Sequence, residues 1–225
     1  MKKVKQLITI FFTLSICMNV FSQKYVEPFV GYIINNGQNV NGASALTIKQ
    51  FCVGVQLASI SSKRYENIFQ LNIGLPITKK LLDSSFTLNP TLPLYKSATK
   101  SINIYSANVN FLQKFTLVRF SKFDNLNFLI NSGLQYQHIN VRYDNDRVNY
   151  VILNPDKTLN RFGVVLGVGI NYTHYLPKGR IFVQTDAYLP AITARNKYPT
   201  QLKSMASVHF IAGYSIPFKS KTNEK

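Results

Sequence analysis

Residues 161–175 read RFGVVLGVGINYTHY, and in this stretch large apolar residues alternate with small or polar ones. One face of a strand would carry Phe162, Val164, Leu166, Val168, Ile170 and Tyr172, and the other Gly163, Val165, Gly167, Gly169, Asn171 and Thr173. Successive side chains of a β-strand point to opposite faces. The stretch therefore predicts a strand with one large apolar face and one face of mostly small or polar residues.

The same alternation recurs along the chain, in runs separated by polar stretches that contain Pro or Asn. The runs lie at about 24–34, 47–60, 66–78, 101–117, 125–141, 161–175, 180–190 and 205–218. The sequence between them shows no long helical periodicity. The pattern predicts an all-β protein of eight strands.

The glycines indicate which face of each strand lies inside. Eight of the 11 glycines share the small, polar face: Gly31, Gly54, Gly74, Gly133, Gly163, Gly167, Gly169 and Gly213. A soluble β-sandwich or a lipocalin-like barrel would instead turn a charged, polar face outward. An eight-stranded barrel has a narrow interior that side chains just fill, and large apolar residues on its outside suit lipid. We therefore predict a closed antiparallel eight-stranded transmembrane β-barrel of up-and-down topology.

The connections between the runs alternate in length. The long ones are about 35–46, 79–100, 142–160 and 191–204, and the short ones 61–65, 118–124 and 176–179. Long loops on one side and short turns on the other are typical of outer-membrane barrels, and an even strand number puts both termini on the short-turn side. We expect four loops outside the cell and both termini in the periplasm.

The first residues differ from the rest of the chain and predict export. Lys2, Lys3 and Lys5 precede an apolar run, Leu7 to Val20, which ends at Phe21-Ser22-Gln23. This is the layout of a secretory signal peptide, and the run is too short and interrupted for a spanning helix. The predicted organisation is a signal peptide at 1–23, a barrel at 24–218 and a tail at 219–225. The predicted location is the bacterial outer membrane.

The chain is strongly basic, with a formal net charge of +17. A basic balance favours an anionic partner. We expect an exported protein to meet phosphorylated lipid, with lipopolysaccharide as the partner and no nucleic acid. The candidate phosphate-binding residues are the loop cations Lys79, Lys80, Lys96, Lys100, Arg195, Lys197 and Lys203. The alternative is a basic surface that is simply solvated.

Few other residues predict chemistry. Cys52 is the single cysteine after the predicted signal peptide, so neither an intramolecular disulfide nor a cysteine metal cluster is expected. No metal-ligand, P-loop or dinucleotide motif is found, and no metal or cofactor is expected. Glu27 and Lys114 both fall on the inward face near the periplasmic end, where we expect them to form an ion pair in the lumen.

Asp186, Ser207 and His209 form the only candidate catalytic set. All three fall on the inward face, and pairing of the last two strands would bring Asp186 near His209. Such a set can generate a nucleophile. The alternative is a buried polar network that fills the lumen, since buried polar groups need partners.

Together these features resemble the small eight-stranded outer-membrane barrels of the OmpA/OmpX type, a porin-like family. The resemblance covers about residues 24–218 and includes a last run, Val208 to Phe218, that ends in an aromatic residue. In that family the barrel-assembly machinery reads such a terminal strand. The seven residues that follow Phe218 here depart from the family pattern.

The resemblance leaves three functions open. The first is a non-enzymatic barrel that presents four loops, in adhesion or envelope integrity. The second is an enzyme that modifies lipid A or phospholipid, and the third an accessory subunit of an envelope machine. Loops on a rigid scaffold often carry function, which favours the first.

Overall fold

The computed structural model describes residues 23–39, 46–62, 64–83, 98–144, 157–195 and 202–218. They form nine strands: β1 (Gln23–Asn39), β2 (Leu46–Ser62), β3 (Tyr65–Pro76), β4 (Lys79–Asp83), β5 (Ala98–Arg119), β6 (Asp124–Asp144), β7 (Lys157–Leu176), β8 (Gly179–Arg195) and β9 (Leu202–Phe218). In this part of the chain, no helix is long and apolar enough to cross a membrane.

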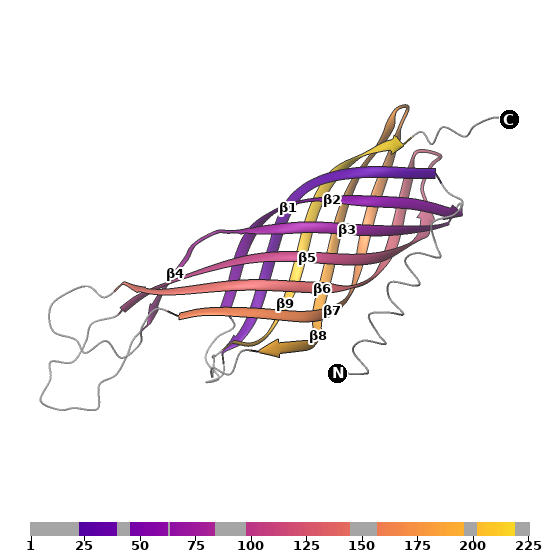
Figure 1. Ribbon diagram of the computed structural model, residues 1–225. Coiled ribbons are helices and arrows are strands. Elements are labelled where there is room, and N and C mark those ends of the chain that lie inside the picture. Colours follow the sequence, from indigo (N-terminus) through magenta and orange to yellow (C-terminus); the bar gives the residue numbers. More distant parts are fainter. Residues whose placement is uncertain are drawn as a thin grey trace, which may run out of the picture.

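The strands close into an antiparallel barrel (Figure 1). Strands that follow one another in the chain pair, with the exception of β3 and β4, and β1 pairs with β9 to complete the ring. Both β3 and β4 pair with β5, on either side of a break at Ile77 and Thr78, so the two act as one strand of the wall. The predicted closed eight-stranded barrel is confirmed.

The strands reach further toward the long connections than the alternation indicated. β5 and β6 stay paired as far as Thr99 opposite Asp144, and β4 occupies Lys79–Asp83, which the sequence assigned to a loop. Figure 1 shows β4, β5 and β6 extending past the rest of the barrel at this end. Backbone pairing continues there because ladder hydrogen bonds do not depend on side-chain alternation.

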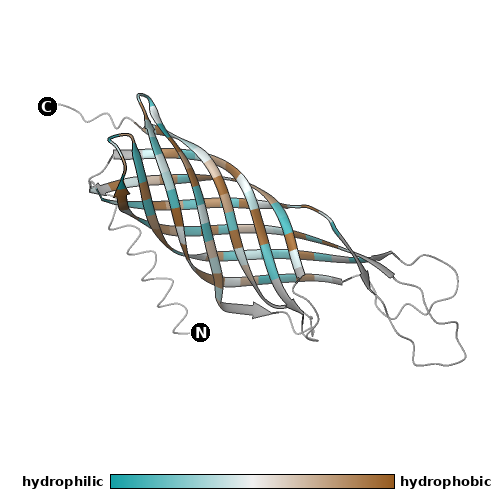
Figure 2. Ribbon diagram, turned by 180° about the vertical axis from the view of Figure 1, so that it is seen from behind, coloured by the Kyte–Doolittle hydropathy of each residue, from teal (hydrophilic) through white to brown (hydrophobic). Residues whose placement is uncertain are grey.

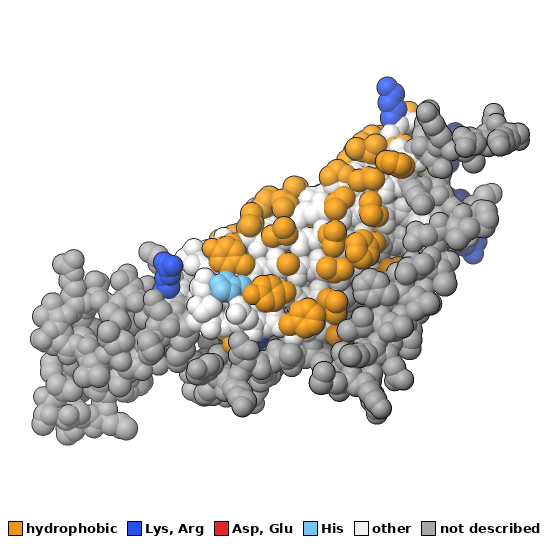
Figure 3. Space-filling model, in the orientation of Figure 1, with side chains coloured by type: hydrophobic (Ala, Val, Ile, Leu, Met, Phe, Trp, Pro, Cys, Tyr) orange, Lys and Arg blue, Asp and Glu red, His pale blue; other side chains and the backbone are white. Residues whose placement is uncertain are grey.

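The wall has the predicted inside-out distribution of hydropathy. Apolar and polar residues alternate along each strand (Figure 2), and apolar side chains cover the outer surface (Figure 3). Val168 on the outside is 52% exposed, whereas Asn110 and Gln70 on the inside are fully buried. A polar interior behind an apolar wall is the arrangement of a barrel in lipid.

Inward glycines make room for the side chains of the neighbouring strands. A Cβ atom on Gly54 would overlap the ring of Phe29, and one on Gly213 would overlap the ring of Phe182. A Cβ atom on Gly169 would overlap the carboxylate of Asp186. The narrow lumen is therefore filled by pairing large residues with glycine.

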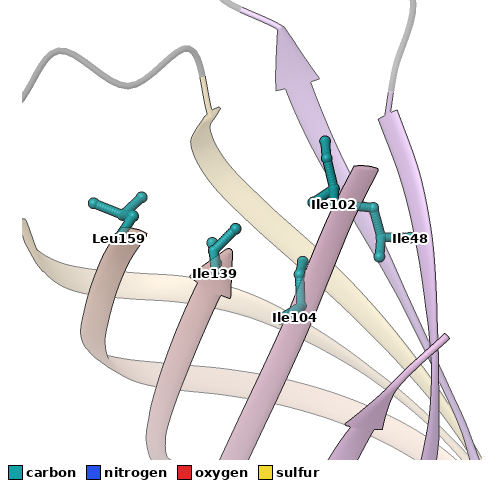
Figure 4. Close-up of a cluster of buried hydrophobic side chains, with 5 residues drawn as sticks. All are labelled: Ile48, Ile102, Ile104, Ile139 and Leu159. Carbon is teal, nitrogen blue, oxygen red and sulfur yellow. The ribbon is translucent and has the colours of Figure 1, made fainter. Parts of the chain in front are cut away.

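The lumen also contains apolar clusters, which the sequence analysis did not predict. The outer apolar cluster comprises Ile48, Ile102, Ile104, Ile139 and Leu159, near the long connections (Figure 4). A central cluster comprises Phe29, Ile33, Cys52, Phe182 and Ile211, and a third Tyr25, Ala58, Ile68, Leu112 and Leu129. Clusters of apolar side chains and groups of polar side chains therefore alternate along the lumen.

One seam of the wall is short. β8 and β9 pair only from Arg180 opposite Ser215 to Tyr188 opposite Ser207. Beyond that level β8 follows β7 as far as Arg195, and β9 follows β1 as far as Leu202. Pro190 has no backbone N–H to donate, which fits the end of the ladder at this point.

Candidate functional site

Ser207 and His209 lie on β9 with their side chains buried inside the barrel. Ser207 Oγ is 3.2 Å from His209 Nε2. The register of β8 and β9 places Asp186 directly opposite His209, and Asp186 is also buried. The three candidate catalytic residues therefore lie at one level of the lumen.

The hydrogen bonds of Asp186 lead away from His209. Asp186 Oδ1 accepts one from Asn131 at 2.8 Å, and Oδ2 accepts one from Gln184 at 2.5 Å. Among the described residues His209 Nδ1 has no hydrogen-bond partner, and the His209 ring packs 4.5 Å from that of Tyr188. A catalytic base needs a third group to orient it, and here the carboxylate binds amides instead.

Four charged side chains form a lumen ion cluster, made of Glu27, Glu66, Lys114 and Arg180. Arg180 lies 2.6 Å from Glu27 and 2.6 Å from Glu66, while Lys114 Nζ lies 2.9 Å from Glu66. Each side chain is at most 8% exposed. The cluster ties β1, β3, β5 and β8 together across the lumen, near the short turns.

The pairing differs from the direct Glu27–Lys114 ion pair expected from the sequence. In the structure Lys114 pairs with Glu66, and Glu27 pairs with Arg180. The sequence analysis did not include Glu66 and Arg180 in the lumen, although each lies an even number of positions from a residue on the same strand that was assigned to the inward face. The alternation of side chains could have placed both residues inside the barrel. It could not have identified their ion-pair partners, because these depend on how the strands are staggered around the ring.

Amide and hydroxyl side chains connect Asp186 to the lumen ion cluster. The hydrogen bonds run from Asp186 through Gln184, Asn171, Asn127 and Thr173 to Lys114. Buried polar groups are stabilised when they find such partners. Asp186 thus forms one end of a polar column that runs through the lumen toward the short turns.

A second polar group lies just below the outer apolar cluster. Gln50 donates to the carbonyl of Ile104 at 2.8 Å and accepts from Asn35 at 2.7 Å, and Gln137 donates to Asn35 at 3.3 Å. Gln50 and Asn35 are fully buried. Side chains therefore occupy the lumen at the outer end as well.

The outer wall of β5, β6 and β7 carries a row of polar residues at its outer end. The register aligns Tyr105 with His138 and His138 with Asn160. Asn160 Oδ1 lies 2.7 Å from His138 Nδ1 and accepts a hydrogen bond from Tyr136 at 3.0 Å. Further out, Arg142 is exposed. This wall places aromatic, amide, imidazole and guanidinium groups where an apolar surface ends.

The candidate phosphate-binding cations are placed only in part. Lys79 donates to the carbonyl of Thr47 at 2.8 Å. Lys80 lies on β4, Lys100 on β5, Arg195 on β8 and Lys203 on β9. Lys96 and Lys197 lie outside the described residues, as do the predicted signal peptide up to Ser22 and the tail at 219–225.

At the short-turn end, Asp124 holds a small cluster on the outer wall. Its Oδ1 accepts from Tyr172 at 2.6 Å and lies 2.7 Å from His174 Nδ1, and its Oδ2 accepts from Ser121 at 2.6 Å. These hydrogen bonds, that of His174 foremost, hold the pKa of Asp124 below its usual range. The cluster braces the turn between β5 and β6 against β7.

Comparisons with known proteins add only structural neighbours. No protein-family model and no curated protein matches the chain. The chain is similar to Neisserial surface protein A, at 11% identity and a TM-score of 0.49, over 87% of this chain and 97% of that chain. It is also similar to Ail, the attachment invasion locus protein of Yersinia pestis, at 10% identity and a TM-score of 0.47, over 88% of this chain and 100% of that chain.

A third neighbour is the N-terminal β-barrel domain of Pseudomonas aeruginosa OprF, at 10% identity and a TM-score of 0.40, over 87% of this chain and 100% of that chain. The assignment of the fold depends on the molecule's own features: the closed register, the apolar outer wall and the filled polar lumen. By these features the chain has the fold of the small eight-stranded outer-membrane β-barrels.

Proposed function

We propose that the protein is a non-enzymatic outer-membrane barrel that presents its four long connections outside the cell, in adhesion or envelope integrity. The observation that carries this proposal is the filled lumen. The lumen ion cluster, the polar column and the outer apolar cluster occupy the interior, and an eight-stranded barrel is too narrow for an open channel. The part of the barrel that remains for recognition is the end that carries the long connections.

The extension of β4, β5 and β6 supports this proposal. These strands continue past the rest of the wall, so their ends lie beyond the apolar band (Figure 1). Rigid strands that project loops into solvent are a common way to build a binding surface.

We also propose that the outer end of the wall contacts the sugar and phosphate groups of lipopolysaccharide. Tyr105, His138, Asn160 and Arg142 supply aromatic, hydrogen-bonding and charged groups at the level where the apolar surface ends. The loop cations predicted from the sequence would add to this surface. Guanidinium and ammonium groups bind phosphate by charge-assisted hydrogen bonds.

Orientation is tested first by inserting an epitope tag into the connection between β6 and β7, and separately into the β7–β8 turn at Lys178. Antibody should label the first variant on intact cells and the second only after the outer membrane is permeabilised. Labelling in the opposite order would contradict the proposed orientation.

Function is tested by shortening each long connection in a strain that lacks the native protein. The shortened barrels should fold but fail to restore adhesion to surfaces or resistance to bile salts. Full restoration of both by all four shortened barrels would contradict a role for the loops.

The Ser207–His209 hydrogen bond supports a second candidate, an enzyme that modifies outer-membrane lipid. The test compares the lipids of strains that carry the native protein, Ser207→Ala, or no protein, by mass spectrometry. An enzyme would leave a lipid species that disappears both in the null strain and with Ser207→Ala. Identical lipids in all three strains would remove this candidate.

A further inference from the structure

The short turns of the barrel share a feature that neither the loops nor the lumen accounts for. Each carries an exposed cation: Arg64 between β2 and β3, Lys122 between β5 and β6, and Lys178 between β7 and β8. We refer to these three residues as the basic rim. Figure 3 shows Lys and Arg side chains at the upper right end of the barrel, and none of the described side chains visible on this face is Asp or Glu.

The acidic groups near the basic rim are already engaged by other residues. Glu27 and Glu66 lie inside the barrel, where Arg180 and Lys114 neutralise them. Asp124 lies on the outer wall and is occupied by Tyr172, His174 and Ser121. Within the described residues, the ion pairs of this structure do not include a basic-rim residue. The rim therefore presents positive charge to its surroundings.

Large apolar side chains lie beside Lys122 on the turn between β5 and β6. Phe120 is 64% exposed and Leu117 59%, and Val118 and Phe123 are also exposed. The ammonium group of Lys122 sits 5.4 Å from the centre of the Phe123 ring. A register shift between Thr116 and Val118 precedes this turn. The turn thus combines a cation with aromatic and aliphatic surface, as side chains at a membrane interface do.

We propose that the basic rim binds the phosphate groups of anionic phospholipids in the leaflet that surrounds the short turns. The proposal rests on the membrane placement given under Proposed function. Cations at a membrane surface attract anionic headgroups, and phosphate accepts charge-assisted hydrogen bonds from Arg and Lys. Phe120, Leu117 and Phe123 favour lipid over a soluble polyanion, because only lipid also offers hydrocarbon to these side chains.

The test uses the barrel in nanodiscs that contain phosphatidylcholine and a minor fraction of phosphatidylglycerol. Lipid that remains bound to the released protein is identified by native mass spectrometry. The rim variant is R64Q/K122Q/K178Q. A control variant, K49Q/K157Q, removes two cations on β2 and β7 nearer the other end, neither of which has been assigned to phosphate binding. Folding of each variant is checked by gel migration before and after boiling.

The native barrel should retain phosphatidylglycerol in excess of its share of the bilayer. The rim variant should lose this enrichment by roughly fivefold or more, as expected for loss of interfacial cations. The control variant should keep it. High salt should reduce the enrichment of the native barrel, because exposed charges are screened.

Equal enrichment in the native barrel and the rim variant would overturn the proposal, and so would equal loss in both variants. Loss of binding to soluble polyphosphate by the rim variant, with its lipid enrichment unchanged, would overturn the proposal in favour of a soluble polyanion. A native chain that fails to form a boiling-sensitive barrel in phosphatidylcholine alone would overturn the membrane placement as well. A native barrel that forms there but shows no lipid preference would overturn only this proposal.

Discussion

At the scale of single residues, the lumen depends on glycine where a neighbouring strand sends a large or charged side chain inward. Gly169 is the clearest case, because an added Cβ would meet the Asp186 carboxylate and the backbone oxygen of Thr185. Backbone atoms in a closed ladder cannot move aside cheaply, so the site does not tolerate a larger residue.

Replacing Gly169 by Val should lower the free energy of unfolding by about 1–3 kcal/mol, the usual cost of overpacking. The measurement is urea unfolding in detergent micelles, followed by tyrosine fluorescence. Val168→Leu is the control, because Val168 faces outward and has room. Unchanged stability in Gly169→Val would mean that the lumen is looser than the structure shows.

The Asp124 cluster predicts a pH effect at a single residue. The folded-state pKa of this carboxyl lies below its usual value of about 3.9, so its charged form stabilises the fold. That contribution is present above the usual value and is lost as the pH falls through the folded-state pKa. Asp124→Asn should therefore unfold at a lower temperature than the native barrel at neutral pH. This difference in unfolding temperature should become smaller in acid.

The unfolding temperature of each protein is measured as the temperature at which its gel migration changes, and the two temperatures are compared over a series of pH values. Lys122→Gln on the same turn serves as the control, since Lys122 makes no hydrogen bond to Asp124 that the structure describes. A difference of constant size down to strong acid would show that the Asp124 charge does not stabilise the turn.

Individual residues also show what alternation can and cannot predict. The alternation of side chains along each strand correctly placed Glu27, Lys114, Asp186 and His209 inside the barrel. It did not identify Arg180 as the partner of Glu27, although their side chains touch across the lumen. Contacts across a barrel depend on its stagger, which no local pattern in the chain encodes.

At the scale of strands, the lumen ion cluster fastens β1, β3, β5 and β8 to one another. Arg180 is its centre, because it contacts both Glu27 and Glu66. Removing one partner of a buried ion pair leaves an uncompensated charge in a region of low dielectric.

Arg180→Gln should therefore destabilise the barrel by about 3–5 kcal/mol, since Glu27 loses its ion-pair partner and Glu66 loses one of its two. Urea unfolding in micelles again provides the measurement. Arg64→Gln should change stability by no more than about 0.5 kcal/mol in detergent, because Arg64 is exposed on a turn. Similar values for the two variants would mean that the ion cluster adds nothing specific to the fold.

The strands also show where sequence-based boundaries fail. The alternation predicted every strand of the wall but ended all of them except β3 early at the long connections, and it missed β4. In β4 and the ends of β5 and β6, backbone hydrogen bonds extend the ladder beyond the residues that alternate in hydropathy. The hydropathy pattern predicts which residues are buried. It does not predict strand pairing that continues beyond the apolar band.

At the scale of the whole molecule, the closed wall predicts resistance to detergent. The folded barrel should migrate differently from the boiled chain on a gel in mild detergent, because the strands hydrogen-bond to one another around a closed ring. The control is the same sample boiled before loading. Identical migration, together with recovery of the protein in the soluble periplasm, would contradict a lipid-embedded barrel.

The short seam between β8 and β9 has a mechanical consequence. The ladder of these strands stops at Tyr188 and Ser207, whereas β1 and β2 stay paired from Gln23 to Gly37. The ring is therefore weaker on one side than on the other. Under a force that pulls the strands apart sideways, β8 and β9 would separate first at Tyr188 and Ser207. The separation would then proceed along this ladder toward Arg180.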